Sequence, residues 1–82
     1  MLYVSYYLKD LAAGDVARVT GFEKTAAAKA YRKRLLAMGL TPGTEFRVTR
    51  FAPMGDPVEI NLRGFSLTLR KNEAAVLKIE KI

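Results

Sequence analysis

The stretch "PVEINLRGFSLTL", residues 57–69, decides the fold, because its two halves alternate in opposite phase. Apolar side chains stand at positions 58, 60 and 62 before Arg63-Gly64, and at positions 65, 67 and 69 after it. A two-residue turn at Arg63-Gly64 explains the change, since it pairs Leu62 with Phe65 and leaves all six apolar side chains on one face. Arginine is unfavourable where a tight turn needs positive φ, so a bulged turn is the alternative. The stretch predicts a β-hairpin with one apolar face.

Three further segments alternate in the same way and predict strands: "DVARVTGF" (15–22), "TEFRVTRF" (44–51) and "AVLKIEKI" (75–82). Gly21, in the first segment, predicts a bulge or a close backbone approach. The alternation places six residues inward: Ala17, Val19, Phe46, Val48, Leu77 and Ile79.

The segment "TAAAKAYRKRLLAMGL" (25–40) predicts the one helix, with Thr25 as its N-cap. We expect Gly39 to be the left-handed residue after the helix, with Leu40 folding back onto Leu35 in a Schellman closure. "TPG" (41–43) then predicts a type II turn. The expected buried stripe consists of Ala28, Tyr31, Leu35 and Met38.

The order of these segments predicts a mainly β fold. Leu8 and Leu11 lie one helical turn apart, and that turn stops at Gly14. About five short strands follow, with the helix inserted between the first and second. Strands with one apolar face close most economically into a small barrel. With 82 residues, we expect a single domain, 1–82: a small SH3-like barrel with one inserted α-helix.

Two absences in the composition bear on chemistry. The chain has no cysteine and no histidine, so thiolate and imidazole metal ligands are missing, as are the usual bases for a nucleophilic serine. The eight acidic residues are scattered along the chain. We therefore expect no metal site, no cofactor, no catalytic residues and no enzyme activity from this chain alone.

The balance of charge and hydropathy favours a cytoplasmic protein with acidic partners. No apolar run approaches the ~18 residues of a membrane span. The start, "MLYVSYYLKD" (1–10), lacks the basic region and cleavage site of a signal peptide. The formal charge is +6, which attracts nucleic acid, anionic lipid headgroups or acidic proteins.

The basic run Arg32, Lys33 and Arg34 is interpreted as a solvated helix face. Three consecutive positions sweep around a helix, so these side chains cannot all face one phosphate track. A basic nucleic-acid-binding barrel stays the alternative function, and self-association is a third hypothesis. The aromatic start, with Tyr3, Val4, Tyr6 and Tyr7, is interpreted either as packing over the barrel end or as a contact surface.

The loop "APMGDP" (52–57) has two compatible interpretations. The first is a structural turn, because proline fixes φ, glycine permits positive φ, and Asp56 can cap its own loop. The second is a rigid platform that presents Met54 and Asp56 to a partner. We favour the turn as the primary cause. The candidate partner-binding residues are Met54, Gly55, Asp56, Pro57, Arg63 at the hairpin tip and Arg70 after the second hairpin strand.

Several motifs, taken together, resemble the ferrous iron transport protein A (FeoA) family. They are "MGLTPG" (38–43), "APMGDP" (52–57) and "LRKNEA" (69–74), in that order and spacing. The similarity runs from about Leu8 to Ile79. Residues 1–7 form an atypical N-terminal extension, longer and more aromatic than the usual start.

The resemblance implies an SH3-like barrel in the bacterial cytoplasm that supports the FeoB permease during Fe(II) uptake. The expected function is that of an accessory or regulatory protein that binds the permease's cytosolic, GTP-binding part and is peripheral to the membrane through that partner. Iron is then the partner's cargo rather than a ligand of this chain. Arg63 is the one residue placed to act as an arginine finger on bound GTP.

Overall fold

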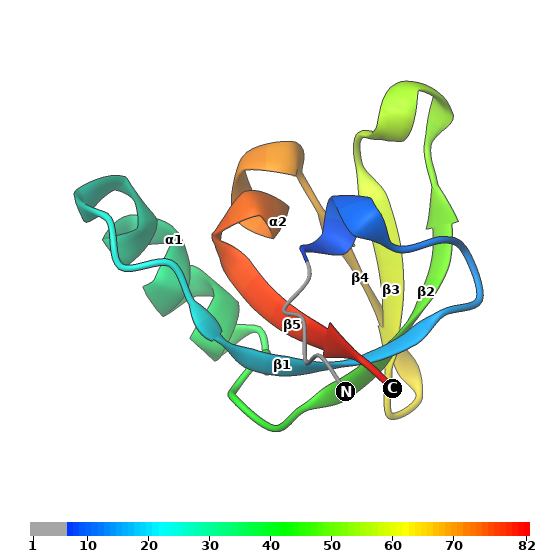
Figure 1. Cartoon of the computed structure of the whole chain (residues 1–82), viewed down its shortest axis with the longest axis horizontal. Coiled ribbons are helices and arrows are strands. Elements are labelled where there is room, and N and C mark those ends of the chain that lie inside the picture. The colour runs from blue at the N-terminus through cyan, green and yellow to red at the C-terminus, as the bar shows by residue number, and fades with distance from the viewer. Residues whose placement is uncertain (1–6) are drawn as a thin grey trace, which may run out of the picture.

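The computed structural model describes residues 7–82, which fold around one curled antiparallel sheet (Figure 1). The strands are β1 (Val16–Phe22), β2 (Glu45–Phe51), β3 (Val58–Leu62), β4 (Phe65–Leu69) and β5 (Leu77–Lys81), in the order β4-β3-β2-β1-β5. The helices are α1 (Ala26–Ala37) and α2 (Lys71–Val76), with 3₁₀ turns η1 (Leu8–Asp10) and η2 (Pro53–Gly55). The predicted mainly β architecture, with five strands and a helix inserted after the first, is confirmed.

The β3–β4 hairpin has the register that the sequence predicts. Leu62 pairs with Phe65, and the pairing continues without a shift to the far end of both strands. Arg63 and Gly64 both have positive φ, at 36° and 93°. The turn is therefore the tight two-residue type with two left-handed residues, and the bulged alternative is not adopted.

Burial along this hairpin is uneven, which the alternation alone did not show. The β3 residues on the apolar face are fully buried, whereas Phe65 on β4 is 48 % exposed and Leu67 is half-buried. β4 is an edge strand of the sheet, and Phe65 is its first residue. Its ring lies 4.0 Å from the position that a Cβ on Gly39 would take, so it borders the end of α1.

The other strands bury the residues that the alternation predicts. The six inward side chains of β1, β2 and β5 are each at most 2 % exposed: Ala17, Val19, Phe46, Val48, Leu77 and Ile79. The pairing of β1 with β5 shifts its register between Val19 and Gly21, which confirms the predicted bulge. These side chains form the centre of the core.

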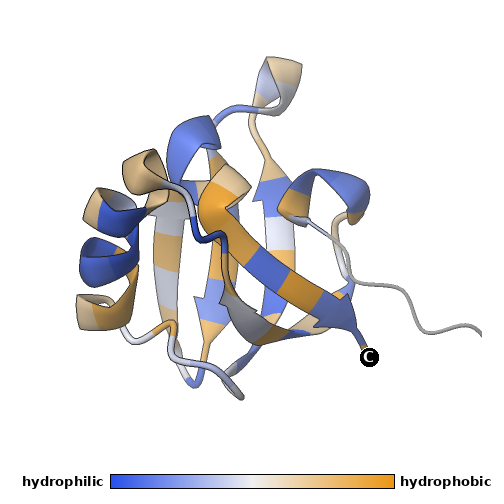
Figure 2. Ribbon diagram, turned by 60° about the vertical axis from the view of Figure 1, so that its left-hand side comes forward, coloured by the Kyte–Doolittle hydropathy of each residue, from blue (hydrophilic) through white to orange (hydrophobic). Residues whose placement is uncertain are grey.

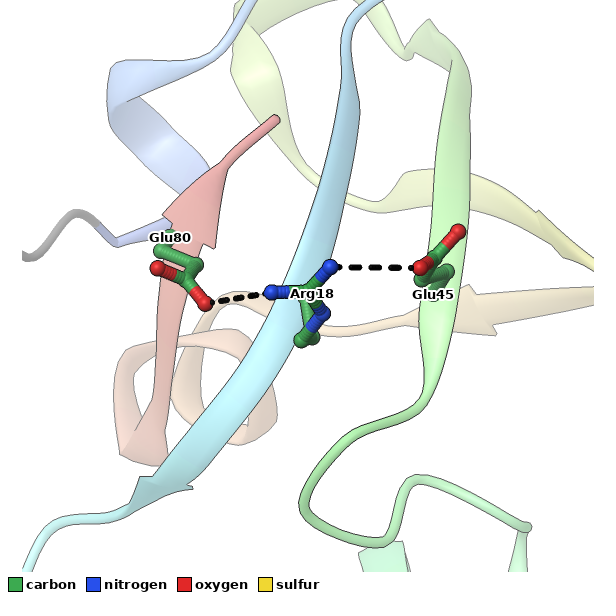
Figure 3. Close-up of polar contacts among 3 residues, drawn as sticks. All are labelled: Arg18, Glu45 and Glu80. Carbon is green, nitrogen blue, oxygen red and sulfur yellow. Dashed lines mark hydrogen bonds and ion pairs between the residues drawn. The ribbon is translucent and has the colours of Figure 1, made fainter.

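On the outer face, Arg18 joins three strands. It lies on β1 and donates to Glu80 on β5 at 2.9 Å and to Glu45 on β2 at 3.3 Å (Figure 3). The hydrogen bond to Glu80, and then that to Glu45, raises the pKa of Arg18. Each carboxylate lies on a strand next to β1, so the cluster stabilises the pairing of β1 with β2 and with β5. Its role is therefore structural.

Helix α1 begins and ends as the sequence predicts. The Thr25 hydroxyl accepts from the Ala28 N–H at 3.1 Å. Gly39 has φ 99° and donates to the Leu36 carbonyl at 3.0 Å, while the Leu40 N–H donates to the Leu35 carbonyl at 3.0 Å. This pair of bonds is the Schellman closure, and it buries Leu35 against the core together with Leu40.

A second helix, α2, adds to the one that the sequence predicts. Residues 71–76 form six residues of helix, so that β5 begins at Leu77. A helix of fewer than two turns gains little from its own backbone hydrogen bonds, because the nucleation cost is not recovered over so few residues. Its formation therefore depends on partners elsewhere in the chain, which the site below supplies.

The closure of α1 predicts a large loss of stability at one glycine and little change at another. Gly39→Ala puts a Cβ on a residue with φ 99°, and we expect it to lower the free energy of unfolding by about 1–2 kcal/mol. Gly21→Ala is the matched control: Gly21 lies outside the positive-φ region and has no atom within 4 Å of an added Cβ. Its change should stay within about 0.5 kcal/mol. Urea unfolding measures both, and equal losses would contradict the closure.

Candidate functional site

A cavity of about 230 Å³ lies between η1, α2 and the β2–β3 loop, and we call it the groove. Its walls are mostly apolar, and two lysines stand among them, one on η1 and one at the start of α2. Figure 1 shows η1 and α2 beside each other, with the β2–β3 loop beyond them. The residues that line the groove are Tyr7, Leu8, Lys9, Phe51, Gly55, Val58, Leu69, Lys71, Ala74 and Ala75.

The η1 wall is fixed at both of its ends. Leu8 is 1 % exposed and belongs to the core, and the Leu11 N–H donates to the Leu8 carbonyl at 3.1 Å. The Tyr7 hydroxyl donates to the Glu23 carboxylate, just after β1. That hydrogen bond raises the pKa of Tyr7 above its ordinary value.

The β2–β3 loop is a closed turn with one side chain fully in solvent. The Gly55 N–H donates to the Ala52 carbonyl at 2.8 Å, and the Ala52 N–H donates to the Pro57 carbonyl at 2.9 Å. Met54 has φ 71°, an uncommon conformation for a residue with a side chain, and is completely exposed. The loop thus has the hydrogen bonds of a structural turn, and it also holds Met54 outward.

Asp56 does not cap its own loop, as the turn interpretation expected, but holds the start of α2. Its Oδ1 accepts from the Lys71 N–H at 2.9 Å, from 15 residues away in the sequence. The first N–H groups of a helix have no partner within it, so this bond satisfies one of them. The loop is therefore joined to the start of α2 by this bond.

Glu73 anchors the other side of α2. It is 7 % exposed, its Oε1 accepts from the Arg70 N–H at 2.9 Å, and its Oε2 pairs with Arg34 on α1 at 3.1 Å. A buried carboxylate is stable only when it is paired in this way. Through Asp56 and Glu73, the loop, α1 and α2 hold one another in place around the groove.

The structure brings together only part of the predicted partner-binding set. Gly55 lines the groove, and Asp56 and Arg70 lie at the start of α2 beside it. Met54 projects from the same loop. Arg63 lies at the opposite end of the β3–β4 hairpin, away from the groove (Figure 1). Pro57 lines a second, shallow hollow with Arg50, Ala52, Glu59 and Thr68.

Several groove residues were not predicted from the sequence. Lys9 and Ala75 carried no distinguishing pattern, since a lone lysine or alanine is ordinary on a surface. Lys71 was noted only as one of several cations, with Arg47, Arg63 and Arg70, that would suit an acidic partner, and not as part of a cavity. Tyr7 was noted only as one of four residues in an aromatic start, and Tyr3, Val4 and Tyr6 lie outside the described residues. The "KNEA" segment was the available signal, because a Glu three residues after the N-cap is typical of a helix start.

The described residues were also compared with the requirements of a metal site and of a membrane-spanning helix. Among residues 7–82, no three His, Cys, Asp or Glu side chains gather in a way that could hold a metal ion. In the same part of the chain, no helix has the length and apolar composition needed to cross a membrane.

Comparisons with known proteins place the chain among relatives involved in iron transport. The sequence model of the FeoA domain family matches residues 6–81. A Porphyromonas gingivalis fusion protein of Fe(2+) transport protein A and Fe(2+) transporter FeoB is 33 % identical over 75 residues. Those residues are 92 % of this chain, which spans only 8 % of the fusion protein's length.

Solved structures agree with the fold. A FeoA-like protein from Clostridium acetobutylicum overlays with a TM-score of 0.84 at 33 % identity, over 100 % of this chain and 91 % of that one. Stenotrophomonas maltophilia FeoA, solved with zinc and described as a prokaryotic SH3 domain protein, overlays with a TM-score of 0.77 at 25 % identity. That overlay covers 92 % of this chain and 89 % of the other. The SH3-like fold predicted from the sequence is confirmed.

The capping role of Asp56 predicts a difference between two substitutions. Asp56→Ala removes the acceptor for the Lys71 N–H, and we expect it to lower the free energy of unfolding by about 1 kcal/mol. Asp56→Asn keeps an acceptor at that position and should restore most of the loss. Urea unfolding compares the three proteins. An Ala variant as stable as the original would show that the loop does not hold α2.

Proposed function

The chain belongs to the FeoA domain family, and from this premise we propose that it is a cytoplasmic accessory protein of ferrous iron uptake that binds the cytosolic part of a FeoB-type permease. The observation that carries the proposal is the fusion relative, in which a FeoA sequence and a FeoB transporter share one chain. Two proteins that also occur as one chain act in the same process and work at close range. Residues 1–82 would supply the FeoA part of this pair.

We place the contact at the groove. Its apolar walls suit an apolar side chain of the permease, and binding pockets are generally built this way. Lys9 and Lys71 suit an acidic residue next to that side chain, because complementary charge directs and speeds encounter. Met54 extends the contact beyond the groove, since a fully exposed methionine packs adaptably against varied surfaces.

The groove also needs little rearrangement to bind. Its walls are held by the Asp56 and Glu73 hydrogen bonds and by the closed β2–β3 loop. A preformed site loses less conformational entropy on binding than a mobile one. By preferring one conformation of the permease's cytosolic part, the protein would shift the permease between states without doing chemistry of its own.

If the permease contacts only the groove and the β2–β3 loop, Arg63 takes no part in the contact. The five residues of β3 separate the hairpin tip from the β2–β3 loop, which corresponds to about 16 Å of strand. A partner that touches both must cover the length of the hairpin. Arg63→Ala therefore tests the arginine-finger idea separately: stimulated GTP hydrolysis that survives the change would end it.

The groove predicts a specific loss of binding. Ala75→Arg places a long side chain at the groove from an exposed position on α2, and we expect at least tenfold weaker binding to the permease. Ala13→Arg adds the same group at an exposed position outside the groove and should bind as the original protein does. Calorimetric titration into the permease's cytosolic domain, with GDP and then a GTP analogue, measures both.

Three outcomes separate the alternatives. Binding in one nucleotide state only would support a partner that senses the permease's conformation. Equal affinity of the two arginine variants would remove the groove from the contact. If the original protein binds neither the domain nor the full-length permease, the proposed function is wrong, and oligonucleotide titration then tests the nucleic-acid alternative.

A further inference from the structure

The side of α1 that faces away from the core carries three cations, Lys29, Arg32 and Lys33, which we call the basic stripe. Residues three and four apart share a helix face, so these three side chains are neighbours. All three are exposed, and in Figure 2 strongly hydrophilic segments alternate with apolar ones along α1. The fourth cation of the helix, Arg34, points to another side and pairs with Glu73.

Nothing within the described residues neutralises the basic stripe. α1 contains no Asp or Glu, and none of the three cations forms an ion pair or hydrogen bond with any of residues 7–82. Like charges at this spacing destabilise a helix, and the first turn also lacks the acid that would complement the helix dipole. The helix therefore retains an unfavourable charge arrangement that an external anionic surface would relieve.

An apolar group lies at the C-terminal end of the same side. The three- and four-residue steps that connect the stripe continue to Leu36 and then to Gly39. Leu36 is half-buried, and the Phe65 ring, which is 48 % exposed, borders Gly39. Cations beside a partly exposed leucine and an exposed phenylalanine are typical of surfaces that lie in the headgroup region of a bilayer.

We propose that the basic stripe, with Leu36 and Phe65 at its end, docks α1 on the surface of a bilayer that contains anionic phospholipid. The choice of a bilayer rests on the proposed function, because a partner of a membrane permease works beside such a surface. A diffuse layer of headgroups also suits three cations that occupy about 6 Å of helix. Single-stranded nucleic acid is bound by several aromatic platforms beside the cations, whereas among residues 7–82 the Phe65 ring is the one exposed aromatic side chain at this end.

The test uses the full chain and permease-free vesicles, either pure phosphatidylcholine or phosphatidylcholine with roughly a third phosphatidylglycerol. We expect binding to the anionic vesicles only, weakening as salt rises. Each cation near such a surface contributes roughly fivefold in affinity. The triple change Lys29→Gln, Arg32→Gln, Lys33→Gln should therefore weaken binding about 100-fold. Phe65→Ser should weaken it several-fold and leave the salt dependence as it was.

The matched control removes the same charge elsewhere: Arg50→Gln, Arg63→Gln, Lys78→Gln. These cations lie on β2, at the hairpin tip and on β5, and none forms a hydrogen bond or ion pair with residues 7–82. The control should keep most of the binding. Equal loss in both triple variants would show that net charge alone is responsible, and it would overturn the proposal.

Two other results would also overturn the proposal that the basic stripe docks on a bilayer. One is the absence of binding to anionic vesicles at low salt, and the other is preferential binding of an oligonucleotide through the same three cations. Ala75→Arg should bind vesicles as well as the original protein, because the groove takes no part. Failure of the permease contact would therefore appear as lost binding to the permease with vesicle binding retained, and failure of the membrane contact as the reverse.

Discussion

Two carboxylates, Asp56 and Glu73, hold the start of α2, and the shape of the groove depends on them. Asp56 accepts from the Lys71 N–H, and Glu73 accepts from the Arg70 N–H and pairs with Arg34. A helix of six residues does not persist on its own propensity. Its place is set by these bonds and by the buried side chains of Ala74 and Val76. Without them, one wall of the groove would have no fixed position.

The same bonds reconcile the two interpretations of the "APMGDP" loop. The prolines and glycine shape a turn that is closed by its own backbone hydrogen bonds, as turn chemistry predicts. That turn then positions Asp56 against α2 and Met54 in solvent. Rigidity that serves the fold also keeps the proposed binding surface in shape, so the structural role of the loop is a condition for the proposed role in recognition.

Local chemistry made much of the fold predictable. The phase change at Arg63-Gly64 predicted the hairpin, and Gly39 predicted the end of α1, because both depend on residues close together in sequence. α2 was not predicted, since the acceptor for its first N–H lies 15 residues earlier. The groove escaped prediction for the same reason: its lining residues, such as Lys9 and Lys71, are far apart in the sequence and share one cavity only in the folded chain. The exposure of Phe65 depends on where the core ends, which alternation does not reveal.

The groove and the basic stripe lie on different elements, and this separation has an energetic consequence. The groove is formed by η1, α2 and the β2–β3 loop, whereas the stripe lies on α1. The ion pair between Arg34 and Glu73 joins α1 to α2. When the basic stripe rests on a bilayer, the groove is therefore held in a fixed orientation relative to that bilayer. A protein held weakly at a bilayer meets a membrane-embedded partner at a raised effective concentration, and two modest contacts on one rigid body then bind more tightly than either alone. This domain has a small core. Two small contact surfaces expose fewer apolar side chains than one extensive interface would, so they lower the stability of the free protein less.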